Sequence, residues 1–227
     1  KADIIINFGR IDYLELIART SKPLLCRFGN PVSQSELDFI LKRRRYFSKR
    51  TCFVGISDSQ VKHLNPPDLI NVVYNSVQTE IFKFQSTPTQ PPYLAFLGRL
   101  TKNKGVDIAI SVAKEAGIFL KIAGNVPNNP SDRLYFETVV KPQLGDGCEW
   151  VGTVNDQQKN DFLGQAQALL FPIRWDEPFG IVMAESLACG TPVIATRRAS
   201  TPEVIDHGRT GFLCNSADEM IKAVRQI

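Results

Sequence analysis

Two carboxylates, Glu177 and Glu185, stand eight residues apart in the chain, and this spacing restricts the chemistry they could share. Glu177 is expected just outside a helix and Glu185 within it, and eight residues at helical rise span roughly 12 Å along the axis. A nucleophile and an acid acting on one glycosidic bond need about 5 Å, and an inverting pair needs about 6.5–9.5 Å. The pair suits instead the binding of hydroxyls at two ends of an extended ligand, such as a sugar nucleotide with its diphosphate between them. On spacing alone, the alternative is an amphipathic helix with one solvated glutamate.

The residues around this pair predict a loop followed by a helix over residues 179–189. Pro178 suits the first helical position, where a backbone N–H is not needed. The N–H groups of Phe179 and Gly180 would lack intrahelical acceptors and could bind an anion. Gly190 suits the position just after the helix. The apolar side expected to face the core consists of Ile181, Ala184, Leu187 and Ala188.

Two cations, Arg99 and Lys104, lie in a stretch bounded by Gly98 and Gly105, between a predicted strand and a predicted helix. A departing nucleoside diphosphate carries negative charge that such a pair can neutralise, Arg99 through two parallel hydrogen bonds and Lys104 as a compact charge. An arginine and a lysine in a loop are otherwise ordinary surface residues. Their place after a strand, in a chain that also has the glutamate pair, favours diphosphate binding. A Gly-x-Gly-x-x-Gly dinucleotide fingerprint is absent.

The composition restricts the class of protein. The 227 residues are 43% hydrophobic and 22% charged, which is typical of a globular chain with a substantial core. A net charge of +4 does not by itself indicate a nucleic-acid partner. The five cysteines are widely spaced, which favours reduced thiols over a disulfide framework or a zinc site. Since no apolar run has the length of a membrane span, a cytoplasmic location is expected.

Strands and helices are predicted to alternate, which indicates an α/β fold of parallel sheets covered on both faces. The proline-rich residues 85–92 have the composition of a linker, so we predict one domain over residues 1–90 and another over residues 91–227. In the first domain we expect strands at residues 3–7, 23–26, 51–56 and 70–74 and helices at residues 13–19 and 35–48, the second capped by Ser35. In the second domain we expect strands at residues 94–97, 119–123, 149–151, 169–171, 193–195 and 211–213, and helices at residues 106–116, 132–141, 157–166 and 179–189.

These motifs resemble those of the retaining GT-B glycosyltransferases, a family with a Glu-x7-Glu signature. The match includes Glu177-Pro-Phe-Gly, Glu185 and the Cys-Gly-Thr-Pro that follows. It extends to the stretch from Gly98 to Gly105, which matches the family's Gly-Arg-x-x-x-x-Lys-Gly. The resemblance implies a GT-B fold of two Rossmann-like, doubly wound domains. It also implies that the N-terminal domain is incomplete, because relatives have further residues before the equivalent of Lys1.

The resemblance implies transfer of a hexose from a nucleoside-diphosphate sugar, UDP- or GDP-linked, to an acceptor hydroxyl with retention of the anomeric configuration. No metal or other cofactor is expected, and no protein nucleophile, since the leaving phosphate is thought to assist on the attacked face. Arg99 and Lys104 would bind the diphosphate, Glu177 the sugar and Glu185 the ribose, which makes the first three the candidate catalytic residues. Further donor contacts are implied for Phe179, Gly180, Gly124 and Val154, although Gly124 and Val154 could equally be turn or strand residues.

Two other functions stay open: a catalytically silent sugar-nucleotide-binding fragment, and an epimerase on the same scaffold. The identity of the acceptor is not readable from the sequence. A basic run begins at Lys42 and ends at Arg50. It is interpreted either as a solvated helix C-terminus that complements the helix dipole, or as a surface for an anionic membrane or an acidic acceptor. The second interpretation would make the protein membrane-peripheral.

Overall fold

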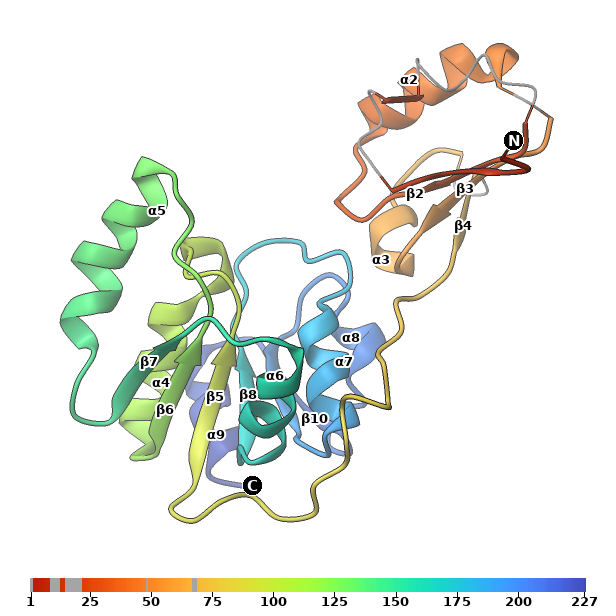
Figure 1. Ribbon diagram of the computed structural model, residues 1–227. Coiled ribbons are helices and arrows are strands. Elements are labelled where there is room, and N and C mark those ends of the chain that lie inside the picture. The colour runs from red at the N-terminus through yellow and green to blue at the C-terminus, as the bar shows by residue number, and fades with distance from the viewer. Residues whose placement is uncertain (1, 9–12, 15–21, 48, 67–68) are drawn as a thin grey trace. The chain divides into compact units, whose positions relative to one another are not determined.

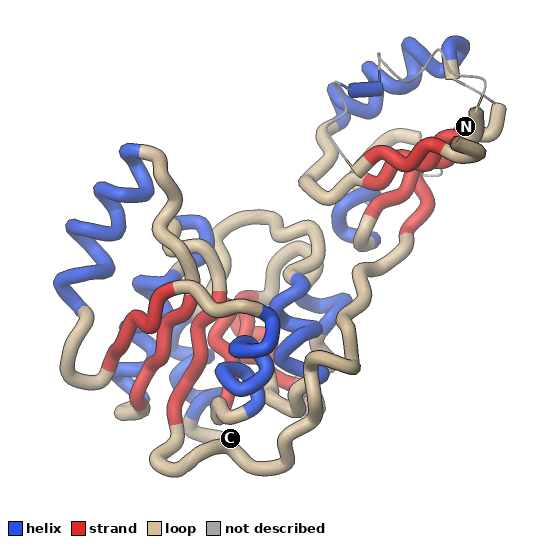
Figure 2. The backbone as a smooth tube through the Cα atoms, in the orientation of Figure 1, coloured by secondary structure: helices blue, strands red, loops and turns tan. Residues whose placement is uncertain are grey.

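The structure is a computed structural model that describes residues 2–8, 13–14, 22–47, 49–66 and 69–227 (Figure 1). The helix predicted at residues 13–19 lies mostly outside the described residues. Figure 2 distinguishes the helices, strands and loops. By its contacts the chain divides into two compact units, Lys1–Asn75 with Glu177–Phe179 and Ser76–Asp176 with Gly180–Ile227.

The first unit is built on a four-stranded parallel sheet in the order β1-β2-β3-β4. Its elements are β1 Ile5–Asn7, β2 Leu24–Arg27, α2 Gln34–Arg43, a 3-10 turn Arg44–Tyr46, β3 Thr51–Gly55, α3 Asp58–Val61 and β4 Ile70–Val72. Each strand lies within two residues of its predicted bounds. Leu37 and Ile40 of α2 are buried in one cluster with Leu24, Phe53 and Ile70 of the sheet. The amphipathic face of α2 therefore covers one side of this sheet.

Helix α2 is capped by Ser33. The N–H of Ser33 donates to Oε2 of Glu36 at 2.7 Å, and the N–H of Glu36 donates to Oγ of Ser33 at 3.3 Å. Each side chain thereby satisfies a backbone donor at the helix N-terminus, as in a capping box. The prediction of Ser35 as the cap is wrong, because the glutamate of the box stands three residues after Ser33.

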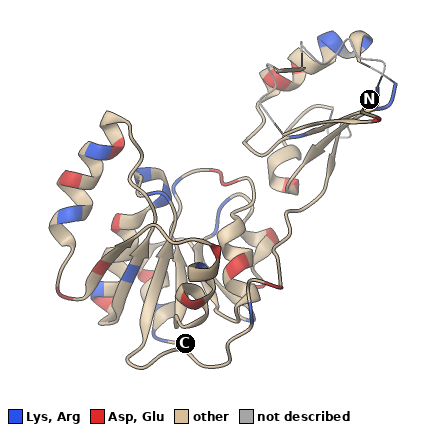
Figure 3. Ribbon diagram, in the orientation of Figure 1, with Lys and Arg blue, Asp and Glu red and all other residues tan. Residues whose placement is uncertain are grey.

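The basic run lies at the C-terminal end of α2 and in the residues after it (Figure 3). The Arg43 guanidinium lies over the ring of Phe39, 3.7 Å from its centroid, and the Arg45 guanidinium lies over Tyr46 at 4.8 Å. Residue 48 is outside the described part of the chain. None of the described helices is long and apolar enough to cross a membrane. Contact of this run with an anionic membrane stays a prediction.

The second unit is built on a six-stranded parallel sheet in the order β10-β9-β8-β5-β6-β7. The strands are β5 Tyr93–Leu97, β6 Phe119–Ala123, β7 Cys148–Gly152, β8 Ala168–Phe171, β9 Val193–Thr196 and β10 Gly211–Cys214. All six predicted strands are confirmed, and no bound differs from the prediction by more than one residue. The continuous apolar runs of β5, β8 and β9 are the pattern expected of strands buried on both faces.

The strand order reverses between the adjacent strands β5 and β8. From β5 the chain adds β6 and then β7 on one side, and from β8 it adds β9 and β10 on the other. The loops after β5 and β8 therefore leave the carboxyl edge of the sheet in opposite directions. Open α/β sheets bind their ligands at such a point.

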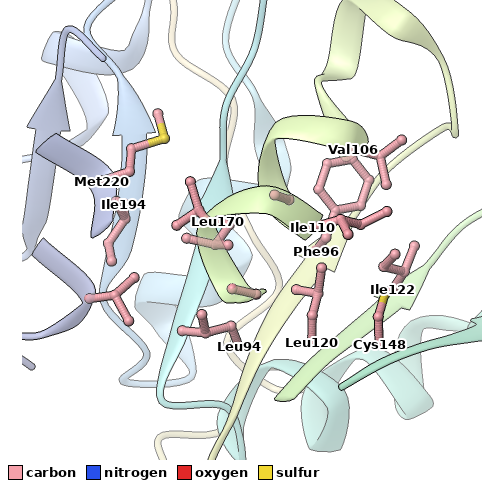
Figure 4. Packing of buried hydrophobic residues seen from close by; sticks show 14 of the residues in the cluster. Leu94, Phe96, Val106, Ile110, Leu120, Ile122, Cys148, Leu170, Ile194 and Met220 are labelled. Carbon is pink, nitrogen blue, oxygen red and sulfur yellow. The ribbon is translucent and has the colours of Figure 1, made fainter. Parts of the chain in front are cut away.

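Helices cover the two faces of this sheet in separate layers. They are α4 Val106–Ala116, α5 Pro130–Tyr135 with a π-helical turn Phe136–Val140, α6 Asp156–Gly164, α7 Ile181–Ala188, α8 Thr201–Val204 and α9 Ala217–Val224. Leu94 and Phe96 of β5 pack with α4 and α9 (Figure 4). Tyr93 and Ala95 pack with α6 and α7 on the opposite face. Successive residues of one strand thus belong to two different cores, as the alternation of strand side chains requires.

Residues 76–92 pack on the second unit. Phe82 is buried in the core beneath α6 and α7. The N–H of Gln85 donates to the carbonyl of Cys189 at 2.9 Å. The division of the chain by contacts therefore falls after Asn75 and not near residue 90, because the segment with linker composition is attached to the second sheet.

The carboxyl ends of β5, β6 and β7 meet at Gly124. Its N–H donates to the carbonyl of Gly152 at 2.7 Å, and its carbonyl accepts from Nε1 of Trp150 at 2.9 Å. Its φ is +143°, and a Cβ atom here would lie 1.8 Å from the carbonyl oxygen of Gly98. Only glycine allows the two loops to approach so closely.

We predict that Gly124→Ala lowers the free energy of unfolding of the second unit by about 3 kcal/mol or more, since a clash with fixed backbone adds to the unfavourable φ. Gly117→Ala is the matched control, because Gly117 has a φ of +73° but no atom within 4 Å of the added Cβ. The control should lose only about 1–2 kcal/mol. Urea unfolding followed by tryptophan fluorescence measures both, since Trp150 and Trp175 both belong to the second unit. Equal losses would contradict the close approach.

Candidate functional site

The loop after β5 presents Arg99 at the carboxyl edge of the sheet. Leu100 is fully buried, and its N–H donates to the carbonyl of Asn125 at 3.0 Å. Thr101 is buried as well, while Arg99 before them is exposed. The loop is thus anchored by its inward residues and leaves the Arg99 side chain in solvent, where it can meet an anion.

Lys104 ends a short 3-10 helix, Lys102–Lys104, in the same loop. Its Nζ lies 5.0 Å from the ring centroid of Trp175 and 6.0 Å from that of Phe171. Phe171 ends β8 and Trp175 belongs to the loop after it. The ammonium group is therefore placed beside the second of the two diverging loops, although the two residues are far apart in sequence.

A network around Asp107 fixes these two loops to each other. Arg174, in the loop after β8, forms two hydrogen bonds with the Asp107 carboxylate at 2.6 and 2.7 Å. The N–H of Arg174 donates to the carbonyl of Asn103 at 2.8 Å, and its Nη1 donates to that of Lys102 at 3.0 Å. The Tyr135 hydroxyl donates to Asp107 Oδ1 at 2.7 Å. This network is not predictable from the sequence, because nothing in the local pattern pairs Asp107 with Arg174.

The charges of this network reinforce one another. Burial acts to raise the pKa of Asp107, but hydrogen bonds from Arg174 and Tyr135 hold it below its ordinary value. The hydrogen bond with Asp107 raises the pKa of Arg174. Burial, followed by the bond to this carboxylate, raises the pKa of Tyr135. The ion pair is thus fully charged near neutral pH.

The loop after β8 places Glu177 before α7, in a partly buried position. The helix begins at Ile181, with Gly180 as the N-terminal cap at a φ of +73°. Placing Pro178 at the first helical position is therefore wrong, because the chain turns at Gly180 before it becomes helical. Glu177 lies outside the helix, as expected, but the helix begins four residues after it, so the helical-rise estimate of its separation from Glu185 does not apply. No hydrogen bond joins the N–H of Phe179 or Gly180 to another described residue.

The end of α7 follows the prediction. Gly190 has a φ of +89°, and its N–H donates to the carbonyl of Leu187 at 3.0 Å. The N–H of Thr191 donates to the carbonyl of Ser186, also at 3.0 Å. These two bonds form the glycine-dependent helix ending known as a Schellman motif. The chain then enters β9 directly, as expected.

The predicted apolar side of α7 is confirmed only in part, since Leu187 and Ala188 pack against the core and Ile181 does not. Ile181 is 45% exposed, whereas Met183, Glu185 and Ser186 are buried. The helix is apolar on most of its surface, so the pattern could not identify the buried side. The consequence concerns Glu185, because the carboxylate that the amphipathic-helix alternative placed in solvent is only 5% exposed.

Glu185 is held by Lys159 of α6, whose Nζ lies 3.0 Å from Oε1. The other oxygen, Oε2, is shielded from solvent and accepts no hydrogen bond from the described residues. Burial raises the pKa of Glu185, and Lys159 partly offsets that effect. A shielded carboxylate oxygen without a donor costs about 1–3 kcal/mol. Oε2 is therefore a buried acceptor for which the described residues supply no donor.

The two remaining candidates have packing roles in the structure. Gly124 joins the strand ends, as described above. Val154 is partly buried and packs against the core beneath α6 and α7, two residues after Gly152, whose φ is +81°. Both follow strands at the carboxyl edge of the sheet, and Gly124 lies beside the loop that contains Arg99. Their contact with a ligand stays a prediction.

A cavity of about 400 Å³ lies at the opposite end of the sheet. Its lining includes Gly117 and Phe119 at the start of β6 and Gly147 and Cys148 at the start of β7. None of the predicted site residues lines it. The carboxyl edge, where the charged loops gather, is therefore a separate region from the amino-edge cavity.

Comparison with solved structures identifies the fold. The crystal structure of Anabaena Alr3699/HepE in complex with UDP and glucose aligns over 99% of this chain and 68% of its own, with a TM-score of 0.78 at 18% identity. Sucrose-phosphate synthase from Thermosynechococcus elongatus aligns over 94% of this chain and 60% of its own, with a TM-score of 0.74 at 20% identity. With its two parallel sheets, the fold is that of the GT-B glycosyltransferases, as predicted.

The family follows from sequence. The family model described as "Glycosyl transferases group 1" matches residues 77–227, and the chain belongs to this family. A protein of the Klebsiella pneumoniae cps region is 31% identical over 195 residues, 81% of this chain and 49% of its own length. Alpha-maltose-1-phosphate synthase of Mycolicibacterium smegmatis is 29% identical over 168 residues, 65% and 42% of the two chains. The chain spans about half the length of these relatives or less.

We predict that Asp107→Asn lowers the free energy of unfolding by about 2 kcal/mol at pH 7, since charge-assisted hydrogen bonds to Arg174 are lost. Because the folded pKa of Asp107 is lowered, its contribution is full above the unfolded pKa and disappears as the pH falls through the folded pKa. Urea unfolding should therefore show a difference in the free energy of unfolding between wild type and Asp107→Asn at pH 7, and this difference should shrink in acid. Lys141→Ala, which breaks an exposed pair with Glu137, is the control and should cost less than about 1 kcal/mol. A deficit that persists unchanged into acid would contradict the ion pair.

Proposed function

We propose that the protein transfers a hexose from a nucleoside-diphosphate sugar to an acceptor hydroxyl with retention of the anomeric configuration. One observation carries this proposal: the loops with Arg99, Lys104 and Glu177 follow the two strands at which the sheet order reverses. Diverging loops at a carboxyl edge suit an elongated phosphate-containing ligand. Family membership supports glycosyl transfer as the reaction class.

Arg99 and Lys104 neutralise the diphosphate in this proposal. Arg99 is exposed and able to form paired hydrogen bonds with phosphate oxygens, and Lys104 contributes a point charge from beside Trp175. The N–H groups of Phe179 and Gly180, for which the described residues offer no acceptor, would add neutral donors. Bond cleavage leaves negative charge on the departing diphosphate, and fixed donors at that place stabilise the transition state. The same residues make catalysis independent of a metal cofactor in our proposal.

Glu177 would accept hydrogen bonds from hydroxyls of the transferred sugar, and Glu185 from hydroxyls of the ribose. The Glu185 assignment is supported by the shielded Oε2, which lacks a donor among the described residues. The base would lie along residues 151–154, with Val154 against it. Gly124 would contribute by shaping the neighbouring loop. The departing phosphate would assist on the attacked face, so that a protein nucleophile is not required.

A panel of UDP- and GDP-hexoses tests the function. Release of the nucleoside diphosphate should be seen with at least one donor, and NMR coupling constants of the product should report the anomeric configuration of the donor. HepE was solved with UDP and glucose, so UDP-glucose is the first donor to test. Donor binding without turnover would support the silent binding protein, and release of a sugar with an altered hydroxyl configuration would support the epimerase.

We predict that Arg99→Ala and Lys104→Ala each weaken nucleoside-diphosphate binding by roughly 1.5–3 kcal/mol, the range for hydrogen bonds to charged groups. Binding of the uncharged nucleoside should change far less. Lys102→Ala is the matched control, because Lys102 lies in the same 3-10 helix and has an exposed side chain. Calorimetry with the diphosphate and the nucleoside measures both effects. Equal losses for the two ligands would remove the phosphate assignment.

The two glutamates should differ in which ligand they affect. Glu185→Ala is expected to weaken the free diphosphate and the sugar-bearing donor alike, because both contain the ribose. Glu177→Ala should spare the free diphosphate and penalise only the donor, by about 1.5–3 kcal/mol. Each variant is titrated with the free diphosphate and with the sugar-bearing donor, which are UDP and UDP-glucose or GDP and a GDP-hexose. The two sets of affinities distinguish the role of Glu177 from that of Glu185. They would have to be reassigned if Glu177→Ala weakened the free diphosphate as much as Glu185→Ala does.

A further inference from the structure

Lys159 joins two carboxylates that differ in their surroundings. Its Nζ lies 3.0 Å from Oδ1 of Asp156, which is exposed on the same helix, and 3.0 Å from Oε1 of the buried Glu185 on α7. The side chain of Lys159 is itself 23% exposed. Since Asp156 is in contact with solvent, it contributes little to holding Lys159 in place. The interaction that determines the position of the ammonium group is therefore the one with Glu185.

Helix α6 holds Lys159 rigidly toward α7. Asn155 caps the helix, and its side chain and that of Gln158 exchange hydrogen bonds with each other's backbone N–H groups at 2.9 Å. The residue after Lys159, Asn160, is buried and accepts a hydrogen bond from the N–H of Lys83 at 2.6 Å. The segment around Lys159 is thus fixed from both sides, so the lysine can define where the Glu185 carboxylate lies.

The ammonium group binds only one of the two carboxylate oxygens. Oε1 of Glu185 is occupied by Lys159, while Oε2 has no donor among the described residues. The terminal torsion of a glutamate is broad, so a small rotation about it can turn Oε2 toward an entering ligand while Oε1 keeps its lysine. Oε1 thus fixes the position of the carboxylate, and Oε2 can accept a hydrogen bond from the ligand.

Resting on the function proposed above, we propose that Lys159 is a positioning residue for nucleotide recognition. It keeps Glu185 ionised and oriented, so that Oε2 accepts a hydroxyl of the ribose. A carboxylate accepts hydrogen bonds through both oxygens only while it is ionised. A buried carboxylate without a counter-cation gains a proton more readily. Lys159 thereby makes ribose recognition insensitive to pH over the neutral range.

The other titratable groups near Glu185 do not provide this charge. Asp156 is negative and acts against ionisation of Glu185. Cys189, after α7, has a thiol pKa raised to about 11 by burial and by the charges of Glu185 and Asp161, and so is neutral at pH 7. The Phe82 ring, 6.0 Å from the Lys159 ammonium, has no ionisable group. Lys159 is the one described cation that these contacts place on Glu185.

The test compares binding of UDP, or of GDP if the protein prefers it, with binding of its 2′,3′-dideoxy form between pH 5.5 and 8.5. Lys159→Met should move the pH at which nucleotide affinity is lost upward by about 1–3 units, the shift that removal of an adjacent opposite charge produces. Affinity for the dideoxy form should not change, because that ligand has no hydroxyl for Glu185. Lys159→Arg should restore the wild-type profile, since it restores a cation.

Two further variants keep the outcomes distinct. Lys141→Met removes a lysine from an exposed pair and should leave both ligands unaffected. In Lys159→Met/Glu185→Gln, the pH dependence should become the same for the nucleotide and its dideoxy form, because the amide does not titrate and only the phosphate, which both ligands share, still does. Thermal unfolding of each variant verifies that it is folded.

Failure of the inference differs from failure of the proposed function. The role of Lys159 is overturned if Glu185→Gln abolishes the preference for ribose over dideoxyribose while Lys159→Met keeps the wild-type pH profile. The ribose assignment of the proposed function fails instead if wild-type protein binds both nucleotides equally. An upward pH shift that is equal for the two nucleotides would assign Lys159 to general stability and would also overturn the inference.

Discussion

The reversal of strand order between β5 and β8 is the constraint on which the rest of the second unit depends. Two adjacent parallel strands whose chains continue to opposite sides must send their loops apart at the carboxyl edge. The cations follow one strand and Glu177 follows the other. The bidentate pair of Arg174 with Asp107 then ties these diverging loops together, so that Lys104 remains beside Trp175. The sheet topology thus determines where the two loops diverge, and the ion pair between Arg174 and Asp107 holds them in a fixed arrangement.

Burial determines how each charged residue can act. Arg99 is exposed, so its charge is available to a ligand but is screened by solvent. Glu185 is buried, where an unpaired charge is costly and a paired one is strong. This difference agrees with the division of tasks in the proposed function, in which Arg99 attracts a highly charged diphosphate and Glu185 selects a neutral hydroxyl. Lys159 connects the two properties, because it supplies the charge that keeps a buried acceptor usable.

The sequence was sufficient for the fold of the second unit and for the gathering of its loops. Short runs of strand-forming residues beside glycine and proline predict β5 to β10, and Gly190 predicts the end of α7. The start of α7 is not predictable in the same way, because Pro178 fits a first helical position as well as it fits a loop. The buried side of α7 could not be predicted from a helix that is apolar on most sides. The partners Arg174–Asp107 and Lys159–Glu185 depend on tertiary packing, which no local spacing encodes.

The central claim is that the loops after β5 and β8 hold a nucleoside diphosphate, and backbone hydrogen exchange with and without saturating UDP or GDP tests it most directly. The account predicts added protection at residues 98–105, in the loop that contains both cations, and at residues 177–185, which lead into α7. Little change is expected at residues 117–119 and 143–148, which border the cavity at the amino edge of the sheet. Protection at that cavity with none at the two loops would contradict the account.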